Sequence, residues 1–516
     1  MNEYINEKTI LFFFGFLFLF VSVVFHVIKK EKFSIAFLFC SALLLFLFAC
    51  ILDPFLNPWD ERFHALVAKN LMNHPLMPTL YDKTLVNMAY DRWDRYHIWL
   101  HKQPLFLWQI AISYKIFGVN EFALRLPSAL LCCANVFALY RSGKILGNSN
   151  IGYYAAFLFT SSSYMLQLVS GWQILEHNDV SFIAYISLSI WAWLEYYNSG
   201  KKYWIVLIGI FSGFAILCKW MVGLLVYLGW GIYSLISNKF IIKKYWDILL
   251  SLLITVIVVL PWQLLILKWY PAEAAKSYNY YSTKHLFEEV DGHGGEWYYH
   301  FSIMGDVFGI IAPYLLLPAL VFFYLKMENK KMFFSFFIML LFVYLLFSFA
   351  ATKMPSFTAI LIVPIYISLA FLMDYLIKQY AKIKMSSAIS KTLLVILLGW
   401  FAFARIDIKS LNETHCIIGQ ENNCRKVWEN NKKIFQNLKL PTHSVIFNVK
   451  GRNYVDAMFY TGIPSYEMIP TEEQYWDMKN KNLRIVLFRP LNDSIPSYLK
   501  RDSTIIIIND TINVCE

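Results

Sequence analysis

Long apolar segments separated by short basic loops are the feature that most constrains the fold of this 516-residue chain. A hydrophobic segment of about 20 residues is long enough to cross a bilayer as a helix. The sequence therefore predicts a polytopic α-helical membrane protein of about 12 spans. We expect these spans at residues 9–28, 33–52, 122–140, 151–170, 180–197, 203–219, 221–237, 246–267, 306–325, 332–350, 356–377 and 391–406.

The composition and the charge agree with this prediction. Hydrophobic residues make up 58% of the chain and charged residues only 16%, whereas about 25% of the residues of a soluble domain are charged. The net charge of +11 is carried by Lys and Arg gathered in short loops, where they set topology and contact anionic lipid heads. We therefore expect membrane lipids as partners and no nucleic acid. The first apolar segment is followed by a second span and lacks a small-residue cleavage site, so we expect no cleavable signal peptide.

Basic residues on alternate loops predict the orientation in the membrane. Loops rich in Lys and Arg are expected to stay on the cytoplasmic side. The opposite side then holds residues 53–121, residues 268–305 and everything after about residue 407. We expect a multi-pass protein of the bacterial inner membrane with its catalytic loops and C-terminal domain on the outer, periplasmic side. The basic loops lie at residues 29–32, 141–144, 201–202, 239–244, 326–331 and 378–384.

The first outer loop is predicted to carry two helices that lie at the membrane surface. The first spans residues 59–71 and opens with two carboxylates, Asp60 and Glu61. His64, four residues after Asp60, shares its polar side. Residues 104–117 are too short for a span, and we expect them to form the second interfacial helix. The spacing of three and four that marks the apolar face of the first helix involves Phe63, Leu66, Val67 and Leu71.

The last hundred residues predict a small α/β domain on the outer side. Residues 444–449, 484–488 and 503–508 have the pattern of short buried strands, and residues 454–460 and 472–479 that of helices. No Gly-rich phosphate loop occurs there, so a nucleotide role is unsupported. A Cys416–Cys424 disulfide would be compatible with an oxidising compartment. The expected domains are thus a membrane domain at 1–406 and an outer α/β domain at 407–516.

A series of short motifs between residues 45 and 370 resembles the GT-C superfamily of glycosyltransferases. The resemblance is to the branch that holds protein O-mannosyltransferases and the aminoarabinose transferase of lipid A. In this family Asp-Glu opens an interfacial helix after the first spans, as Asp60-Glu61 does here. The other matching segments, in chain order, are 101–108, 117–118, 125–128, 178–179, 218–220, 293–299 and 352–357.

Four positions depart from the family pattern. The family's arginine and tyrosine after the Asp-Glu pair fall on Phe63 and His64, and its acidic residue before Lys102 falls on His101. The tyrosine of the last motif is Phe357, which removes a hydroxyl that would contact phosphate. The resemblance still implies a GT-C-like membrane domain with two outer loops, at 53–121 and 268–305.

The resemblance implies transfer of a sugar, with inversion, from a polyprenyl-phosphate carrier to a lipid, protein or glycan acceptor of the cell envelope. Asp60 is the candidate for the base or acceptor-orienting residue, together with Glu61 and Asp179. The alternative is that Asp60 and Asp179 only cap helices. The substrate- and phosphate-binding candidates are Lys102, Arg125, Lys219, Lys353 and His64. Each of these cations, taken alone, could instead reach the membrane interface as a snorkelling side chain.

A zinc-like divalent metal is a further expectation, with His101 and His293 as ligands. Two other function classes stay open at this stage. A transporter or flippase for a lipid-linked sugar would carry ionisable residues deep in its spans and repeat symmetry. A non-catalytic relative would fit the departures at Phe63 and Phe357.

Overall fold

The computed structural model describes residues 7–86, 92–172, 176–238, 241, 245–382, 386–417, 422–490 and 494–515. The chain divides into two compact units, each of which is described by itself. The first contains Met1–Leu52, Lys102–Phe106 and Leu126–Thr414, and the second contains Asp53–His101, Leu107–Arg125 and His415–Glu516. The second unit therefore combines most of the first predicted outer loop with the C-terminal segment.

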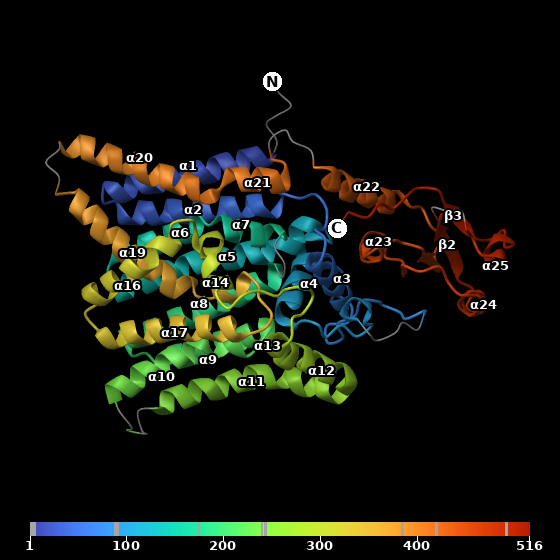
Figure 1. Cartoon of the computed structure of the whole chain (residues 1–516), viewed down its shortest axis with the longest axis horizontal. Coiled ribbons are helices and arrows are strands. Elements are labelled where there is room, and N and C mark those ends of the chain that lie inside the picture. Colours follow the sequence, from blue (N-terminus) through green and yellow to red (C-terminus); the bar gives the residue numbers. More distant parts are fainter. Residues whose placement is uncertain are drawn as a thin grey trace. The chain divides into compact units, whose positions relative to one another are not determined.

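The first unit is a bundle of apolar helices (Figure 1). Within it α1 packs against α2 and α20, α9 against α8 and α11, and α19 against α6 and α16. The long helices are α1 (Glu7–Val27), α2 (Glu31–Cys50), α5 (Glu121–Leu146), α6 (Ser149–Thr160), α7 (Ser163–Ser170), α8 (Glu176–Ser199), α9 (Tyr203–Lys219), α10 (Leu225–Asn238), α11 (Trp246–Trp269), α16 (Ala312–Lys326), α17 (Lys330–Phe349), α19 (Ile362–Tyr380) and α20 (Ser387–Ile406). The shorter ones are α12 (Pro271–Tyr278), α13 (His285–Phe287), α14 (Tyr299–Ser302), α15 (Met304–Phe308), α18 (Ser356–Ala359) and α21 (Ile408–His415).

Helices occur at each of the segments where spans are predicted, and the polytopic helical fold is confirmed. Among the described residues, seven helical segments are long and apolar enough to cross a membrane: α1, α2, α5, α11, α17, α19 and Ser387–His415. Three other predicted spans, α9, Met221–Ser237 and α16, are shorter apolar helices. Residues 104–117 are helical as α4 (Leu105–Phe117). The orientation stays a prediction, and Lys239, Lys243, Lys244 and Lys384 of the basic loops lie outside the described residues.

Small residues allow α9 and α11 to approach closely. A Cβ atom added to Gly209 would lie 2.6 Å from the carbonyl oxygen of Ser251, and one added to Gly213 would lie 2.7 Å from the side chain of Val258. Glycines four apart on one helix form a flat strip, and close backbone contact of this kind stabilises helix pairs in membranes.

The predicted span at 151–170 is interrupted, which the sequence pattern does not reveal. α6 ends at Thr160 and α7 begins at Ser163. The guanidinium of Arg405, on α20, donates to the carbonyl oxygen of Leu158 at 2.9 Å and to Ser161 Oγ at 3.2 Å. It also donates to the carbonyl oxygen of Phe308 at 3.0 Å. Arg405 therefore supplies hydrogen bonds at the point where a continuous helix would have supplied its own.

The second unit contains a three-stranded parallel sheet in the order β1-β2-β3. The predicted strands and helices of the C-terminal segment are confirmed. The strands are β1 (Ser444–Phe447), β2 (Arg484–Phe488) and β3 (Ile506–Ile508). The helices of this unit include α3 (Asp60–Leu71), α4, α22 (Asn423–Asn437), α23 (Asn453–Thr461), α24 (Glu472–Asn480) and α25 (Ser497–Lys500), and a short 3₁₀ helix covers Trp93–Arg95.

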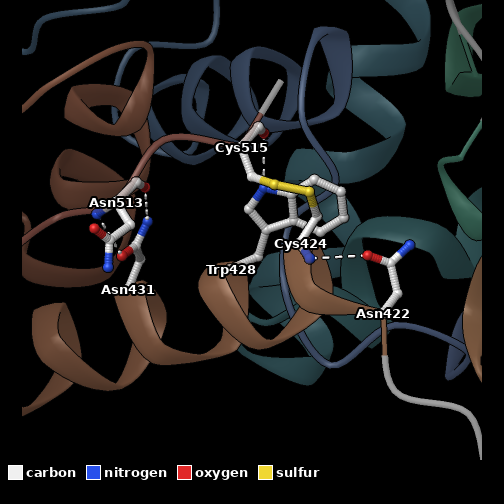
Figure 2. The surroundings of a disulfide bond; sticks show 6 residues. All are labelled: Asn422, Cys424, Trp428, Asn431, Asn513 and Cys515. Carbon is white, nitrogen blue, oxygen red and sulfur yellow. Dashed lines mark hydrogen bonds between the residues drawn. A yellow bond between two sulfur atoms is a disulfide. The ribbon is translucent and has the colours of Figure 1, made fainter.

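The disulfide of the second unit joins Cys424 and Cys515 (Figure 2), so the Cys416–Cys424 pairing is wrong. The two cysteines are 91 residues apart in sequence, whereas Cys416 is a free thiol. The bond fastens the last described residues to the start of α22. Next to it the indole nitrogen of Trp428 donates to the carbonyl oxygen of Cys515 at 3.3 Å.

Candidate functional site

The acidic pair Asp60-Glu61 stands at the first two positions of α3. The residue before it, Trp59, has φ 72° and ψ −130°, a region that non-glycine residues rarely adopt, and no side chain caps the helix. The capping position is therefore Trp59, and the interpretation of Asp60 as an N-cap is wrong by one residue. Strained backbone of this kind persists only where the surroundings hold it.

Protein covers α3 on nearly every side. All of its residues except Lys69 are buried; Asp60 is 4% exposed and Glu61 is fully buried. The predicted apolar face is confirmed as buried, but the polar side is buried too, and α3 packs against α23. Carboxylates so enclosed need partners or pay a large desolvation penalty.

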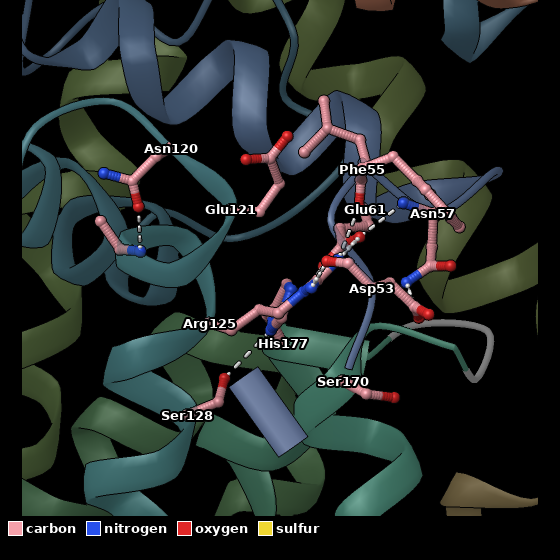
Figure 3. Close-up of polar contacts among 12 residues, drawn as sticks. Asp53, Phe55, Asn57, Glu61, Asn120, Glu121, Arg125, Ser128, Ser170 and His177 are labelled. Atoms are coloured by element: carbon pink, nitrogen blue, oxygen red, sulfur yellow. Dashed lines mark hydrogen bonds and ion pairs between the residues drawn. The ribbon is translucent and has the colours of Figure 1, made fainter. Parts of the chain in front are cut away.

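Arg125 is the partner of Glu61 (Figure 3). Its Nε and one terminal nitrogen donate to the two carboxylate oxygens of Glu61 at 2.8 and 2.9 Å. The same guanidinium donates to the carbonyl oxygens of Asp53 at 2.6 Å and Phe55 at 2.8 Å. Both side chains of the ion pair are fully buried. In this arrangement Arg125 fixes Glu61 and the chain that leads to α3, and a phosphate contact would require the pair to open.

A second carboxylate, Asp53, is held by two residues that the sequence reasoning did not single out. One oxygen pairs with the guanidinium of Arg425, and the other lies 2.9 Å from His415 Nδ1 and accepts from Asn57 Nδ2 at 3.0 Å. Burial would raise the pKa of Asp53, but the charge and hydrogen bond of His415 and the charge of Arg425 outweigh it, and the pKa lies well below its usual range. Asp53 is therefore ionised. Because His415 and Arg425 come from more than 350 residues later, only the position of Asp53 just after a span could have marked it.

Two further residues of α3, Arg62 and His64, also lie inside the second unit. Arg62 pairs with Asp456 of α23 at 3.1 Å. His64 is fully buried and its ring stands edge-on to Trp99, 6.1 Å between centroids. His64 is thus enclosed by protein, and its assignment as a substrate-binding residue stays a prediction.

The Arg62–Asp456 pair gives a prediction about pH. Burial, aided by the charges of Glu61 and Glu121 and opposed by Arg62, raises the pKa of Asp456 to about 6. The folded protein therefore holds a proton that the unfolded chain releases near pH 4, and stability falls as the pH rises from about 4 to about 6, by up to ~3 kcal/mol.

We expect Asp456→Asn to remove this loss of stability between pH 4 and 6. The midpoint of thermal unfolding of the purified protein, recorded between pH 4 and 7, measures the loss. The difference in midpoint between variant and wild type should grow in favour of the variant across this interval. A constant difference would contradict the raised pKa. Asp477→Asn, an exposed aspartate on α24, is the control.

The first unit contains an ion pair between two predicted site residues, the buried Asp179 of α8 and the partly buried Lys219 at the end of α9. Asp179 is the fourth residue of α8, so it does not cap the helix. Lys219 also contacts Ser356 Oγ at 3.4 Å and lies 4.9 Å above the ring of Phe357. Phe357, where the family has tyrosine, thus offers a ring face to the ammonium in place of a hydroxyl.

The backbone beside Lys219 is strained in the same way as the backbone beside Asp60. Trp220 has φ 115° and ψ −168°, a conformation that glycine adopts without strain. The ring of Trp220 packs on Tyr278, 5.3 Å between centroids.

Lys102 belongs to the same group of residues. It is 6% exposed and close enough to act electrostatically on Asp179 and on His285. Burial lowers the pKa of His285 to about 3, with contributions from the charges of Lys102, Lys219 and His293. His285 is therefore neutral, and the two lysines against the single carboxylate of Asp179 leave this group, the lysine cluster, with an excess of positive charge.

Two predicted motifs, at 293–299 and 352–357, lie side by side in the first unit. The backbone N–H of Lys353 donates to the carbonyl oxygen of His293 at 2.7 Å, and that of Thr352 to His285 at 3.1 Å. The Lys353 ammonium donates to the carbonyl oxygens of Phe347, Ser348 and Ala350, at 3.0, 2.7 and 2.5 Å. These bonds use its three donors, so Lys353 caps the end of α17. Its assignment to phosphate stays a prediction.

The assignment of His101 and His293 to a metal stays a prediction. In the part of the chain that the structure describes, no group of three or more His, Cys, Asp or Glu side chains is placed to hold an ion. The ring of His101 stacks on Trp93 with 4.4 Å between centroids.

Comparison with known proteins gives matches at three levels. Residues 101–264 match the family described as dolichyl-phosphate-mannose-protein mannosyltransferase. An uncharacterized protein of Aquifex aeolicus is 30% identical over 152 residues, which cover 29% of this chain and 27% of that protein. The chain thus aligns with little more than a quarter of the length of this relative.

The solved structures show the same fold. ArnT from Cupriavidus metallidurans, solved with bound undecaprenyl phosphate, matches with a TM-score of 0.65 and 13% identity, covering 87% of this chain and 88% of that one. The archaeal oligosaccharyltransferase AglB from Archaeoglobus fulgidus matches with a TM-score of 0.56 and 12% identity over 84% of this chain and 64% of that one. This multi-pass membrane protein thus has the fold of these two solved structures, and about a third of its chain matches the mannosyltransferase family.

Proposed function

We propose that this protein transfers a sugar from a polyprenyl-phosphate carrier to an acceptor at the outer face of the membrane. The observation that carries the proposal is the lysine cluster. Lys102 and Lys219 both lie inside the segment that matches the mannosyltransferase family, and the carboxylate of Asp179 offsets only part of their positive charge. Positive charge placed on a departing phosphate lowers the barrier to transfer. ArnT, which has this fold, was solved with undecaprenyl phosphate.

In this reaction an acceptor oxygen attacks the anomeric carbon, and the bond from that carbon to the phosphate oxygen breaks. The electron pair stays on the phosphate, where Lys102 and Lys219 offset the charge. If the acceptor is a hydroxyl, its proton passes to the carboxylate of Asp60. Attack opposite the leaving phosphate inverts the anomeric configuration. Asp179 holds the Lys219 ammonium in place through their ion pair.

The test is release of free polyprenyl phosphate from labelled polyprenyl-phosphate sugars by the purified protein in lipid nanodiscs with membrane acceptor extract. We expect Lys102→Gln to lower kcat/KM for the donor by roughly 10- to 100-fold, since hydrogen bonds to charged groups contribute about 1.5–3 kcal/mol. Lys409→Gln, an exposed lysine of the first unit, is the matched control. Absence of lipid phosphate release with every donor tested would reject the function.

A further inference from the structure

A pocket in the second unit lies beside the start of α3. Its walls include Trp59 and Arg62 from the α3 region, Trp428 of α22 and Arg452 from the residue before α23. Cys515, held by the disulfide drawn in Figure 2, is another lining residue. The space in the pocket and its mouth, open solvent included, is about 320 Å³, so a bound ring would lie mainly in the mouth. Neither arginine of this pocket is among the site residues predicted from the sequence.

One hydrogen-bond donor of Arg62 has no acceptor among the described residues. The side chain is 6% exposed and pairs with Asp456 through a terminal nitrogen. Its Nε is buried and has no hydrogen-bond partner in the described part of the chain. A buried donor without an acceptor costs about 1–3 kcal/mol, and more when the group is charged. An acceptor atom brought by a ligand would remove this penalty.

Arg452 adds a second cation and a stacked pair. Its guanidinium lies 4.2 Å from the ring centre of Trp59, and its Nε lies 3.4 Å from Asp94. Its side chain is 21% exposed, so part of it can be reached by an incoming group. Guanidinium groups bind planar carboxylates with paired hydrogen bonds.

The charge balance favours a ligand with a single negative charge. Arg62 is offset by Asp456 and Arg452 by Asp94, so the pocket is not strongly positive. A carboxylate can accept the remaining N–H groups without adding the second charge of a phosphate.

The tryptophans supply the apolar part of the site. Trp59, whose backbone is strained, is 39% exposed. Trp428 is half-buried. Flat indole faces pack against the C–H face of a sugar ring, while polar groups at the edge fix its orientation. The mixture of two arginines and two tryptophans fits a sugar ring that carries a charged substituent.

We propose that this pocket binds a carboxylate-bearing sugar, a uronic acid unit, of the acceptor. The proposal that the pocket binds such a sugar depends only on the pocket. The role of the pocket in recognising the acceptor rests on the proposed function. Trp59 directly precedes Asp60 and Arg62 follows two residues after it, so a sugar held there is bound by residues within two positions of the residue proposed to take the acceptor proton. The acceptor is then an acidic glycan or glycolipid.

The experiment is saturation-transfer NMR titration of the full-length protein in detergent with methyl glucuronide, methyl glucoside, glucose 6-phosphate and acetate. Methyl glucuronide should saturate a site with a Kd at least tenfold lower than the other three. Equally tight binding of methyl glucoside would show that the carboxylate does not contribute to affinity. Equally tight binding of acetate would show that the sugar ring does not contribute. Equal or tighter binding of glucose 6-phosphate, or no saturable binding, would overturn the uronic acid assignment.

Variants locate the site. Arg62→Gln alone leaves Asp456 without its partner, so the double variant Arg62→Gln/Asp456→Asn keeps the charge balance. We expect this double variant and Arg452→Gln each to weaken glucuronide binding at least tenfold. The exposed Arg501→Gln is the control that keeps binding unchanged, and Asp456→Asn, which leaves Arg62 without its counter-charge, should not weaken it. Unchanged binding in both arginine variants would place the sugar elsewhere.

The two proposals fail separately. Asp60→Asn should abolish transfer and keep glucuronide binding. Transfer by a wild-type protein that does not bind glucuronide would reject the pocket and retain the enzyme. Binding without transfer to any acceptor would reject the enzyme and retain the pocket.

Discussion

Replacing Asp60 by asparagine is expected to lower the rate of sugar transfer by roughly 100- to 10,000-fold, the range found for removal of a general base. The change is isosteric, so the enclosed position at the start of α3 should be retained. Steady-state release of polyprenyl phosphate, compared at equal amounts of folded protein, measures the effect. Asp82→Asn, an exposed aspartate of the same unit, should leave the rate unchanged.

The size of the loss also reports on the acceptor. A hydroxyl needs its proton removed during attack, whereas an ionised phosphate acceptor does not. A full effect on Asp60→Asn therefore supports a hydroxyl of a glycan, lipid or protein. Full activity in Asp60→Asn, with normal expression, would refute the role of this residue.

Breaking the pair of Glu61 and Arg125 should have the largest effect on stability. Arg125→Met leaves the Glu61 carboxylate buried without its cation, which typically costs about 3–5 kcal/mol. We expect a large fall in the yield of folded protein and in its unfolding temperature, measured by size-exclusion chromatography after heating. An Arg125→Met variant as stable as the wild type would contradict the buried, bidentate geometry.

The double variant Glu61→Gln/Arg125→Met separates structure from chemistry. It removes both charges, so it should recover part of the stability, although the carbonyl oxygens of Asp53 and Phe55 still lose their donor. If this double variant folds but transfers no sugar, Glu61 acts in the reaction as well as in the fold. Recovery of both folding and transfer would make Glu61 purely structural. Lys432→Met, which opens the less enclosed pair with Glu121, gives the comparison for an ordinary ion pair.

Local patterns along the chain were sufficient to predict most of the fold. The spans, β2 and α24 follow from hydrophobic runs and periodicity within a few residues. The break between α6 and α7 does not, because residues 151–170 are apolar throughout and the stabilising Arg405 comes from a distant helix. The Cys424–Cys515 bond was missed for the same reason, since spacing favours the near cysteine while the fold brings the far one.

In the candidate site, too, local patterns could be predicted and contacts with distant residues could not. The Asp60-Glu61 pair, Asp179 and Lys219 could be singled out from motifs, because each motif places a charged residue at the end of an apolar segment. What the charges bind could not be anticipated. Lys353 caps a helix, and Arg125 binds Glu61; each of these partners depends on backbone geometry or on a residue far away in sequence.

The contact of Arg405 with the interrupted helix has a consequence for biogenesis. Ser161 and Arg405 are 244 residues apart, so the N-terminal helices enter the bilayer long before the arginine is synthesised. Until then the carbonyl groups at the end of α6 must be satisfied by water or by the insertion machinery, because lipid offers no donors. Membrane insertion of this protein is therefore expected to finish late, with the arrival of α20 completing a helix pair that was made in the first third of the chain.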